Sequence, residues 1–382
     1  MTQKYDVAIV GAGIVGLAHA YHVAKSGKRV LVLERSPRAQ GASIRNFGML
    51  WPIGQPPGEM DTLARRSLEI WLQVLQASGL WHARCGSLHL AYHEDEEAVL
   101  SEFAGMSPER GCSMLSPSEI TSRFSAVSGR GLRSSLLSPT EVTVDPRQIV
   151  AELPNYLSRE FGVHFEFGAR VIDYSQPRLL TVNGEWIVEN AIVCTGVDFR
   201  ELAPEAFADS GLVPCKLQMM RTPPTSQFLG TMIAGGLTLR HYKSFANCPS
   251  LPKVIERLDR EMPEYHRYGI HVMAAQNGLG EIIIGDSHEY GDAIEPFDKP
   301  SIDAMILSYL QTLLKLDVEI ASRWHGSYVK HPSEPFMIAK PRPGLTAVTG
   351  LGGAGMTLSF GLAERVVLDS FSPLCASGRG EK

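Results

Sequence analysis

The sequence predicts an α/β fold in which a mostly parallel sheet with covering helices is interrupted by an inserted α+β region. Two apolar strands enclose a helix within residues 4–34, as in a βαβ unit. Residues 346–368 return to a strand–turn–helix pattern near the other end. Between them, residues 217–289 hold short β-rich runs separated by turns, which favours an antiparallel sheet on a second domain.

The length and composition indicate an ordinary globular protein of two domains. A chain of 382 residues exceeds what one hydrophobic core usually supports, and 44% apolar with 20% charged residues is typical of globular proteins. A net charge of −5 gives no electrostatic case for nucleic acid or an anionic membrane as partner. No long apolar run and no secretion signal are visible, so we expect no membrane span and a cytoplasmic protein. The six cysteines are scattered and are expected to be reduced thiols.

The most specific motif follows the first strand. Gly11, Gly13 and Gly16 form a G-x-G-x-x-G turn at the start of a helix, and Glu34 ends the second strand. Gly11 permits the tight turn, Gly13 lets backbone N–H groups approach a pyrophosphate, and Gly16 lets the helix pack closely on the strands. Glu34 can accept hydrogen bonds from ribose hydroxyls and disfavours a 2′-phosphate. The unit therefore predicts a site for NAD or FAD rather than NADP.

Local patterns place the other elements along the chain. Asp145 followed by Pro146 is a good start signal for one helix, and residues 190–196 form an apolar strand suited to the centre of a parallel sheet. The helices are expected at 61–78, 95–111, from 117 onward, 147–161, 302–315 and 356–368. Further strands are expected at 86–92, 163–167, 169–174, 280–285 and 346–349.

Two more glycine-bearing segments accompany the first motif. Residues 42–50 read ASIRNFGML, and residues 350–358 read GLGGAGMTL. Together with the first motif they resemble the D-amino-acid oxidase superfamily of FAD-dependent oxidoreductases, especially the glycine oxidase and sarcosine oxidase branch. In that resemblance residues 42–50 form the loop under the flavin, and residues 350–358 form the turn and helix start beside the isoalloxazine ring.

The resemblance implies a Rossmann-like FAD-binding domain of three layers (ββα) with an inserted α+β substrate domain. We expect the FAD-binding domain at 1–82, 142–215 and 323–376, the substrate domain at 83–141 and 216–322, and a flexible tail at 377–382. The residues implied to contact FAD come from six segments. They are Gly11, Gly13, Ile14, Val15, Gly16, Glu34, Arg35, Ser43, Arg45, Asn46, Phe47, Gly48, Met49, Val171, Thr195, Gly196, Gly352, Gly353, Ala354, Gly355, Met356 and Thr357.

The chain departs from the family in the stretch 324–332. Sarcosine oxidases hold FAD covalently through a cysteine there, and this chain has none, so FAD is expected to be non-covalent. Amino-acid-oxidising relatives clamp the substrate carboxylate with an arginine in this stretch, which is also missing. A different anion is expected, and phosphonate suits lysine as a point charge. Residues 45–55 resemble a bacterial subgroup associated with aminophosphonate catabolism.

The resulting hypothesis is an FAD-dependent oxidase of a small primary or secondary amine, with O₂ as acceptor. A flavin-dependent hydroxy-acid dehydrogenase with another acceptor, and a non-catalytic nucleotide-binding protein, remain as alternatives. No metal site is expected, since His19 and His22 are predicted to be exposed. The oligomeric state is not predicted. The residues expected to position the substrate are Arg240, Tyr242, Tyr328, Lys330, His331 and Met49.

Overall fold

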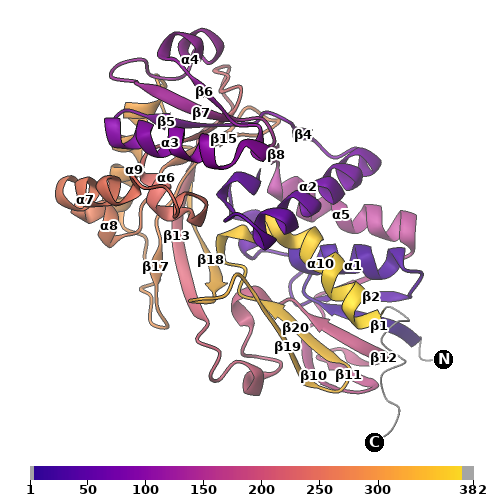
Figure 1. Ribbon diagram of the computed structural model, residues 1–382. Coiled ribbons are helices and arrows are strands. Elements are labelled where there is room, and N and C mark those ends of the chain that lie inside the picture. The colour runs from indigo at the N-terminus through magenta and orange to yellow at the C-terminus, as the bar shows by residue number, and fades with distance from the viewer. Residues whose placement is uncertain (1–3, 372–382) are drawn as a thin grey trace, which may run out of the picture.

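The computed structural model of the protein describes residues 4–371, which are organised around two large sheets (Figure 1). The α/β class and the inserted antiparallel region are both confirmed. Cys375 and the expected tail at 377–382 lie outside the described residues.

The first sheet has a parallel core of five strands in the spatial order β9, β2, β1, β12, β20. The apolar run of β2 is buried throughout, as expected for a central parallel strand. The central position expected for residues 190–193 is confirmed, because β12 lies between β1 and β20. The bounds are β1 Lys4–Val10, β2 Val30–Glu34, β9 His164–Phe167, β12 Gly184–Val193 and β20 Leu345–Thr349, with antiparallel additions β10 Val171–Ser175, β11 Arg178–Thr181 and β19 Met337–Arg342.

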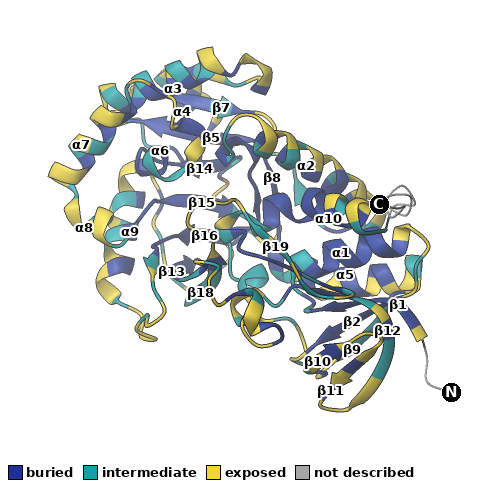
Figure 2. Cartoon of the chain, turned by 60° about the horizontal axis from the view of Figure 1, so that its bottom comes forward, coloured by how far each residue is buried: buried dark blue, intermediate teal, exposed yellow. Residues whose placement is uncertain are grey.

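Four helices pack together on one face of this sheet (Figure 2): α1 Ile14–Lys25, α2 Glu59–Ser78, α5 Pro146–Phe161 and α10 Gly355–Phe371. The Trp71 indole on α2 donates a hydrogen bond of 2.8 Å to the Met356 carbonyl at the start of α10. The expectation that His19 and His22 are exposed is wrong, because α1 is enclosed by α5 and α10 and both side chains are buried. Burial lowers the pKa of each imidazole to about 4.

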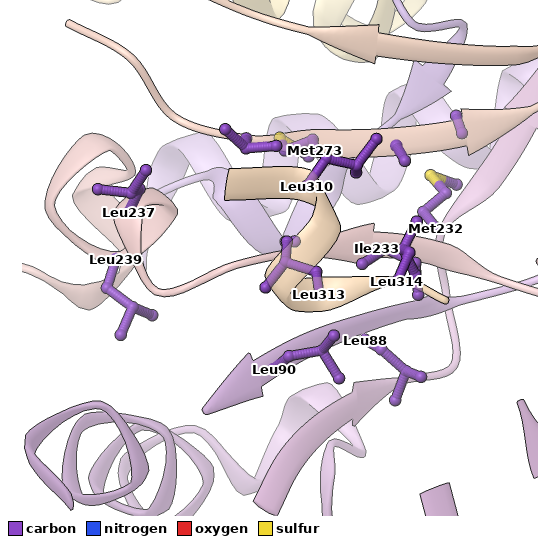
Figure 3. Close-up of a cluster of buried hydrophobic side chains, with 14 of the residues drawn as sticks. Leu88, Leu90, Met232, Ile233, Leu237, Leu239, Met273, Leu310, Leu313 and Leu314 are labelled. Atoms are coloured by element: carbon purple, nitrogen blue, oxygen red, sulfur yellow. The ribbon is translucent and has the colours of Figure 1, made fainter. Parts of the chain in front are cut away.

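The second sheet has the order β17-β13-β16-β15-β14-β5-β7-β6, and β18 pairs with β13. Its core includes Leu88, Leu90, Ile233, Met273 and Leu310, which interdigitate between strands and helix α9 (Figure 3). Its strands are β5 Ser87–Ala91, β6 Ser113–Leu115, β7 Ser134–Ser138, β13 Val213–Arg221, β14 Met232–Ala234, β15 Met273–Gln276, β16 Ile282–Gly285, β17 Glu289–Tyr290 and β18 Ser322–Lys330. Its helices are α3 Glu94–Met106, α4 Pro117–Arg123, α6 Leu237–His241, α7 Leu251–Glu261, α8 Pro263–Arg267 and α9 Pro300–Leu313.

The β-rich interpretation of residues 217–289 needs correction. Helices α6, α7 and α8 interrupt the strands, and residues 240–243 lie in helical turns rather than at a strand end. Leu251, Val254 and Leu258 form the buried face of α7 at helical spacing, a period that the sequence already contained.

The two-domain division stays a prediction. Strand β18 pairs with β13 along its whole length, so by sheet membership residues 322–330 go with the second sheet. A small third sheet connects the two regions through β3 Met49–Leu50, β8 Val142–Val144 and β4 His82–Ala83. Within residues 4–371, no helix combines the length and apolarity needed to cross a bilayer.

Candidate active site

A cavity of about 900 Å³ lies where the carboxyl ends of the parallel strands of the first sheet face the second sheet. Val10, Glu34, Cys194 and Thr349, at the ends of β1, β2, β12 and β20, line one side of it. In open α/β sheets the crevice outside these strand ends is the usual ligand site. The opposite wall comes from the second sheet and the segment around α6.

The first glycine turn is closed by contacts that leave no room for side chains. Gly11 has a φ of +105°, and a Cβ there would lie 2.6 Å from the Cys194 carbonyl oxygen. A Cβ on Gly16 would lie 1.9 Å from the Gly11 carbonyl oxygen. Gly13 borders the cavity, so its backbone is open to a ligand. Gly11 and Gly16 therefore allow the tight turn, and Gly13 leaves the backbone of the turn accessible to a ligand.

Glu34 is held in place beside this turn. Its carboxylate accepts hydrogen bonds of 3.0 Å from the backbone N–H groups of Ala12 and Ser36. Each carboxylate oxygen retains a further lone pair, and the side chain borders the cavity. This geometry fits a carboxylate that accepts hydrogen bonds from ribose hydroxyl groups. Ser43, from the second glycine-bearing segment, accepts a 2.9 Å hydrogen bond from the Ile14 N–H and so joins the two segments.

The third segment completes the cavity. A 3₁₀ turn at Gly352–Ala354 leads into α10 at Gly355, and Thr357 Oγ1 accepts a 3.0 Å hydrogen bond from the Trp51 N–H. A Cβ on Gly353 would lie 3.8 Å from the Tyr328 hydroxyl. This backbone therefore lies open to the cavity opposite the second sheet, as a flat ring requires.

The cavity fits the FAD that the resemblance implies, because all three glycine-bearing segments border one space. Gly16 and Gly48 do not line it: a Cβ on Gly48 would lie 2.1 Å from the Val144 carbonyl oxygen, so this glycine serves backbone packing. Arg35 borders the cavity and pairs with Asp198 at 2.6 Å. The other implied FAD residues that line the cavity are Gly11, Gly13, Ile14, Val15, Glu34, Ser43, Arg45, Asn46, Phe47, Met49, Val171, Thr195, Gly196, Gly352, Gly353, Ala354, Gly355, Met356 and Thr357.

Of the residues expected to position the substrate, the structure brings five to the cavity: Tyr242, Tyr328, Lys330, His331 and Met49. Arg240 is not among the residues that line it. Its guanidinium points to Asp259 on α7, 3.5 Å away. His241, Tyr242 and Lys243, which follow Arg240 in the chain, do line the cavity.

The end of the cavity beside β18 and residues 241–243, here called the substrate end, carries two lysines without a carboxylate partner among the described residues. Within residues 4–371, no carboxylate lies within ion-pair distance of Lys243 or Lys330, and both lysines line the cavity. Burial, and then repulsion from Lys243, lower the pKa of the Lys330 ammonium. Two uncompensated lysines favour an anionic ligand at this end.

A polar cluster lies in the opposite wall, and of its members the sequence had indicated only His241 as a candidate. His241, His271, Asp286 and His288 all line the cavity, and the rings of His241 and His271 are stacked with centroids 3.8 Å apart. Burial lowers the pKa of His288 to about 4 and raises the pKa of Asp286 well above its usual value. The only signal in the sequence is the D-x-H spacing of Asp286 and His288.

Comparisons with known proteins identify relatives of this chain. Glycine oxidase from Bacillus licheniformis is 25% identical over 228 residues, which cover 56% of this chain and 60% of that protein. Peroxisomal sarcosine oxidase from Homo sapiens is 24% identical over 267 residues, which cover 60% of this chain and 67% of that protein. The matched stretch thus spans less than two thirds of the Bacillus licheniformis relative.

The solved structure of glycine oxidase from Bacillus cereus ATCC 14579 superposes with a TM-score of 0.77 at 19% identity, covering 95% of this chain and 94% of that one. It therefore has the same fold. A family model described as FAD dependent oxidoreductase matches residues 6–367, nearly the whole chain. The protein belongs to this family of FAD-dependent oxidoreductases.

Proposed function

We propose that the protein oxidises the C–N bond of a small primary or secondary amine to an imine, which water hydrolyses to a carbonyl compound. Molecular oxygen is the proposed electron acceptor, and hydrogen peroxide the second product. One observation carries the proposal: a single cavity is lined both by a dinucleotide-binding turn and by Lys243 and Lys330, which have no carboxylate partner among the described residues. The similarity to glycine and sarcosine oxidases supports an amine as the substrate.

FAD, when bound, supplies the acceptor for the hydride of the carbon that carries the nitrogen. The protein orients the substrate and excludes water from it. Met49, Trp51 and Phe47 are buried side chains that line the cavity, together with Tyr328 on β18 and Tyr242 at the end of α6. An amine held between these walls loses contact with water, and its orientation lowers the entropic part of the barrier.

The anion of the substrate is proposed to bind at Lys330, Lys243 and Tyr328. An α-carboxylate bound by a planar arginine fork would need a free guanidinium here. Arg240 points away, and Arg45, which lines the cavity, donates from Nη1 to the His325 carbonyl at 3.2 Å. Lysine ammonium groups bind a compact dianion well as point charges. We therefore propose an aminophosphonate as the substrate in preference to a plain α-amino acid.

FAD is proposed to be held without a covalent bond. Among the described cysteines, only Cys194 lines the cavity, and burial raises the pKa of its thiol. A thiol with a raised pKa is a poor nucleophile because little thiolate is present. It also lies beside the Gly11 turn, at the dinucleotide end.

The test is anaerobic bleaching of the flavin absorbance with a panel of amines. The panel contains glycine, sarcosine, D-alanine, 2-aminoethylphosphonate and N-methyl-2-aminoethylphosphonate, with 2-hydroxyglutarate as the rival hydroxy acid. Bleaching by an aminophosphonate, followed by peroxide formation when air is admitted, is the expected result. Bleaching by the hydroxy acid alone, with turnover only on artificial acceptors, would replace the amine oxidase with a dehydrogenase.

A further inference from the structure

The amine must lose a proton before its carbon can give up hydride. A small aliphatic amine has a pKa of about 10, close to that of lysine, so it reaches the protein as an ammonium ion. Only the neutral amine has the lone pair that pushes the hydride out. The proton must therefore pass either to bulk water before binding or to a group in the cavity.

The buried cluster of the second-sheet wall is built around one carboxyl group. Asp286 and His271 are joined by a reciprocal pair of backbone hydrogen bonds of 3.2 and 2.9 Å, which holds their side chains together. Asp286 Oδ1 lies 3.1 Å from His271 Nδ1, and neither atom has any other polar partner. Asp286 is 6% exposed and His271 is 3% exposed, yet both border the cavity.

His288 places a hydrogen-bond acceptor beside this carboxyl group. Its Nδ1 donates a 2.9 Å hydrogen bond to the Gly269 carbonyl, which assigns the neutral tautomer with a bare Nε2. That Nε2 lies 3.8 Å from Asp286 Oδ2, so when the carboxyl group is ionised, two lone pairs face each other and repel. A proton taken up between the two atoms removes this repulsion.

The other groups that face Asp286 are poorer acceptors. The phenols Tyr242, Tyr290 and Tyr328 and the thiol of Cys215 have pKa values raised by burial, so they are already protonated at neutral pH. Their protonated forms cannot accept the proton of an ammonium ion.

The histidines are opposed by charge as well as by burial. Burial lowers the pKa of His241 and His271 well below the usual value, and the positive charge of Arg240 lowers both further. Lys330 acts in the same direction on His241 and His288. When it is ionised, Asp286 is therefore the best final acceptor on this wall, because burial raises its affinity for a proton.

A metal ion is a weaker explanation of the three histidines. Their nitrogens come within 4.8 Å of one another. However, a metal lies close to the plane of each imidazole that binds it, and His241 and His271 are parallel within 7° at 3.8 Å. Two such planes do not meet at one ion, and Lys330 adds a repelling charge.

We propose that Asp286 takes the proton of the substrate ammonium ion, with His271 as the relay and His288 as the partner that holds the transferred proton. One N–H bond of the ammonium breaks, and one O–H bond forms on the Asp286 carboxylate. No electrons move in this step, so a neutral amine is left beside the flavin position and the total charge is unchanged. The inference rests on the proposed amine oxidation and adds to it a specific base.

The test uses the holoenzyme and a non-oxidisable amine, 2-amino-2-methylpropylphosphonate, which has no hydrogen on the carbon that carries nitrogen. Its dissociation constant is measured between pH 8 and 10 from the perturbed flavin spectrum. Wild type is expected to show a nearly constant value, because the proton passes to Asp286. In Asp286→Asn only the neutral amine binds, so the dissociation constant should fall about tenfold per pH unit up to the amine pKa.

The matched control is Glu141→Gln, which changes another fully buried carboxyl with a raised pKa outside the cavity. It should keep the wild-type pH profile. In single-turnover reduction by N-methyl-2-aminoethylphosphonate, Asp286→Asn should be slower by about 100-fold at pH 8, with the difference vanishing near pH 10.

Parallel pH profiles in wild type and Asp286→Asn, with FAD content unchanged, would overturn the role of Asp286. That outcome leaves the amine oxidase intact if wild type is bleached by amines. If no amine bleaches wild type, the proposed function itself fails. If the dissociation constant of the wild type already falls about tenfold per pH unit, a proton acceptor inside the cavity is also excluded, without the need for any variant.

Discussion

Two alanine substitutions in the first glycine turn should separate folding from nucleotide binding. Gly13 has the extended backbone conformation φ −69° and ψ 172°, which alanine adopts freely. Its added Cβ would lie 3.1 Å from Ser43 Oγ, a side-chain atom that can move. Gly11 has φ +105°, and its Cβ would press on the Cys194 carbonyl oxygen at 2.6 Å, which cannot move independently.

The magnitudes follow from these contacts. Gly13→Ala should change the free energy of unfolding of the apoprotein by no more than about 1 kcal/mol. Because Gly13 borders the cavity, its methyl group should occupy space needed by the pyrophosphate and weaken FAD binding at least tenfold, or about 1.4 kcal/mol. Gly11→Ala should destabilise the apoprotein itself by about 1–3 kcal/mol, through strain at a left-handed position.

The free energy of unfolding is measured by urea denaturation of each apoprotein. FAD binding is measured by titrating each apoprotein with FAD and recording the quenching of flavin fluorescence. The two variants are each other's control, since both add one methyl group to the same turn. If Gly13→Ala binds FAD as tightly as wild type, the pyrophosphate does not approach this backbone and the interpretation of the motif is refuted.

The remaining predictions concern the substrate end of the cavity and the buried ion pair between Arg110 and Asp61. Lys330→Ala should raise KM for the aminophosphonate at least tenfold without loss of FAD, whereas Arg240→Ala should leave KM unchanged; equal effects would remove Lys330 from the site. Tyr328→Phe should also raise KM with FAD retained, and unchanged kinetics would exclude a hydrogen bond from its hydroxyl. Arg110→Ala should destabilise the protein by about 3–5 kcal/mol in urea unfolding, because it breaks a buried pair with Asp61 at 3.1 Å; a loss below 1 kcal/mol would contradict this.

The sequence was most informative where backbone chemistry depends on glycine. The turn at Gly11–Gly16 and the turn at Gly350–Gly355 both border the cavity, because close approach of backbone to a ligand restricts the residue type itself. Glu34 was equally predictable, since its position at the end of a strand is set by local pattern. These features need no knowledge of how distant segments pack.

The proton-accepting wall could not be predicted in this way. His271 and Asp286 meet because β15 and β16 pair in antiparallel register, and His241 joins them from α6. Each residue alone is an ordinary polar side chain, and only the long-range pairing makes a cluster. The burial of His19 and His22 was missed for a similar reason, since the helices that cover α1 come from residues 146–161 and 355–371.

The central claim is that three glycine-bearing segments, far apart in sequence, surround one FAD. The most direct measurement is denaturation of the purified holoprotein, followed by chromatographic identification and quantification of the nucleotide in the supernatant. The account predicts free FAD, close to one equivalent per chain, with no flavin left on the precipitated protein. Folded protein that neither releases FAD nor takes it up on reconstitution would contradict the claim.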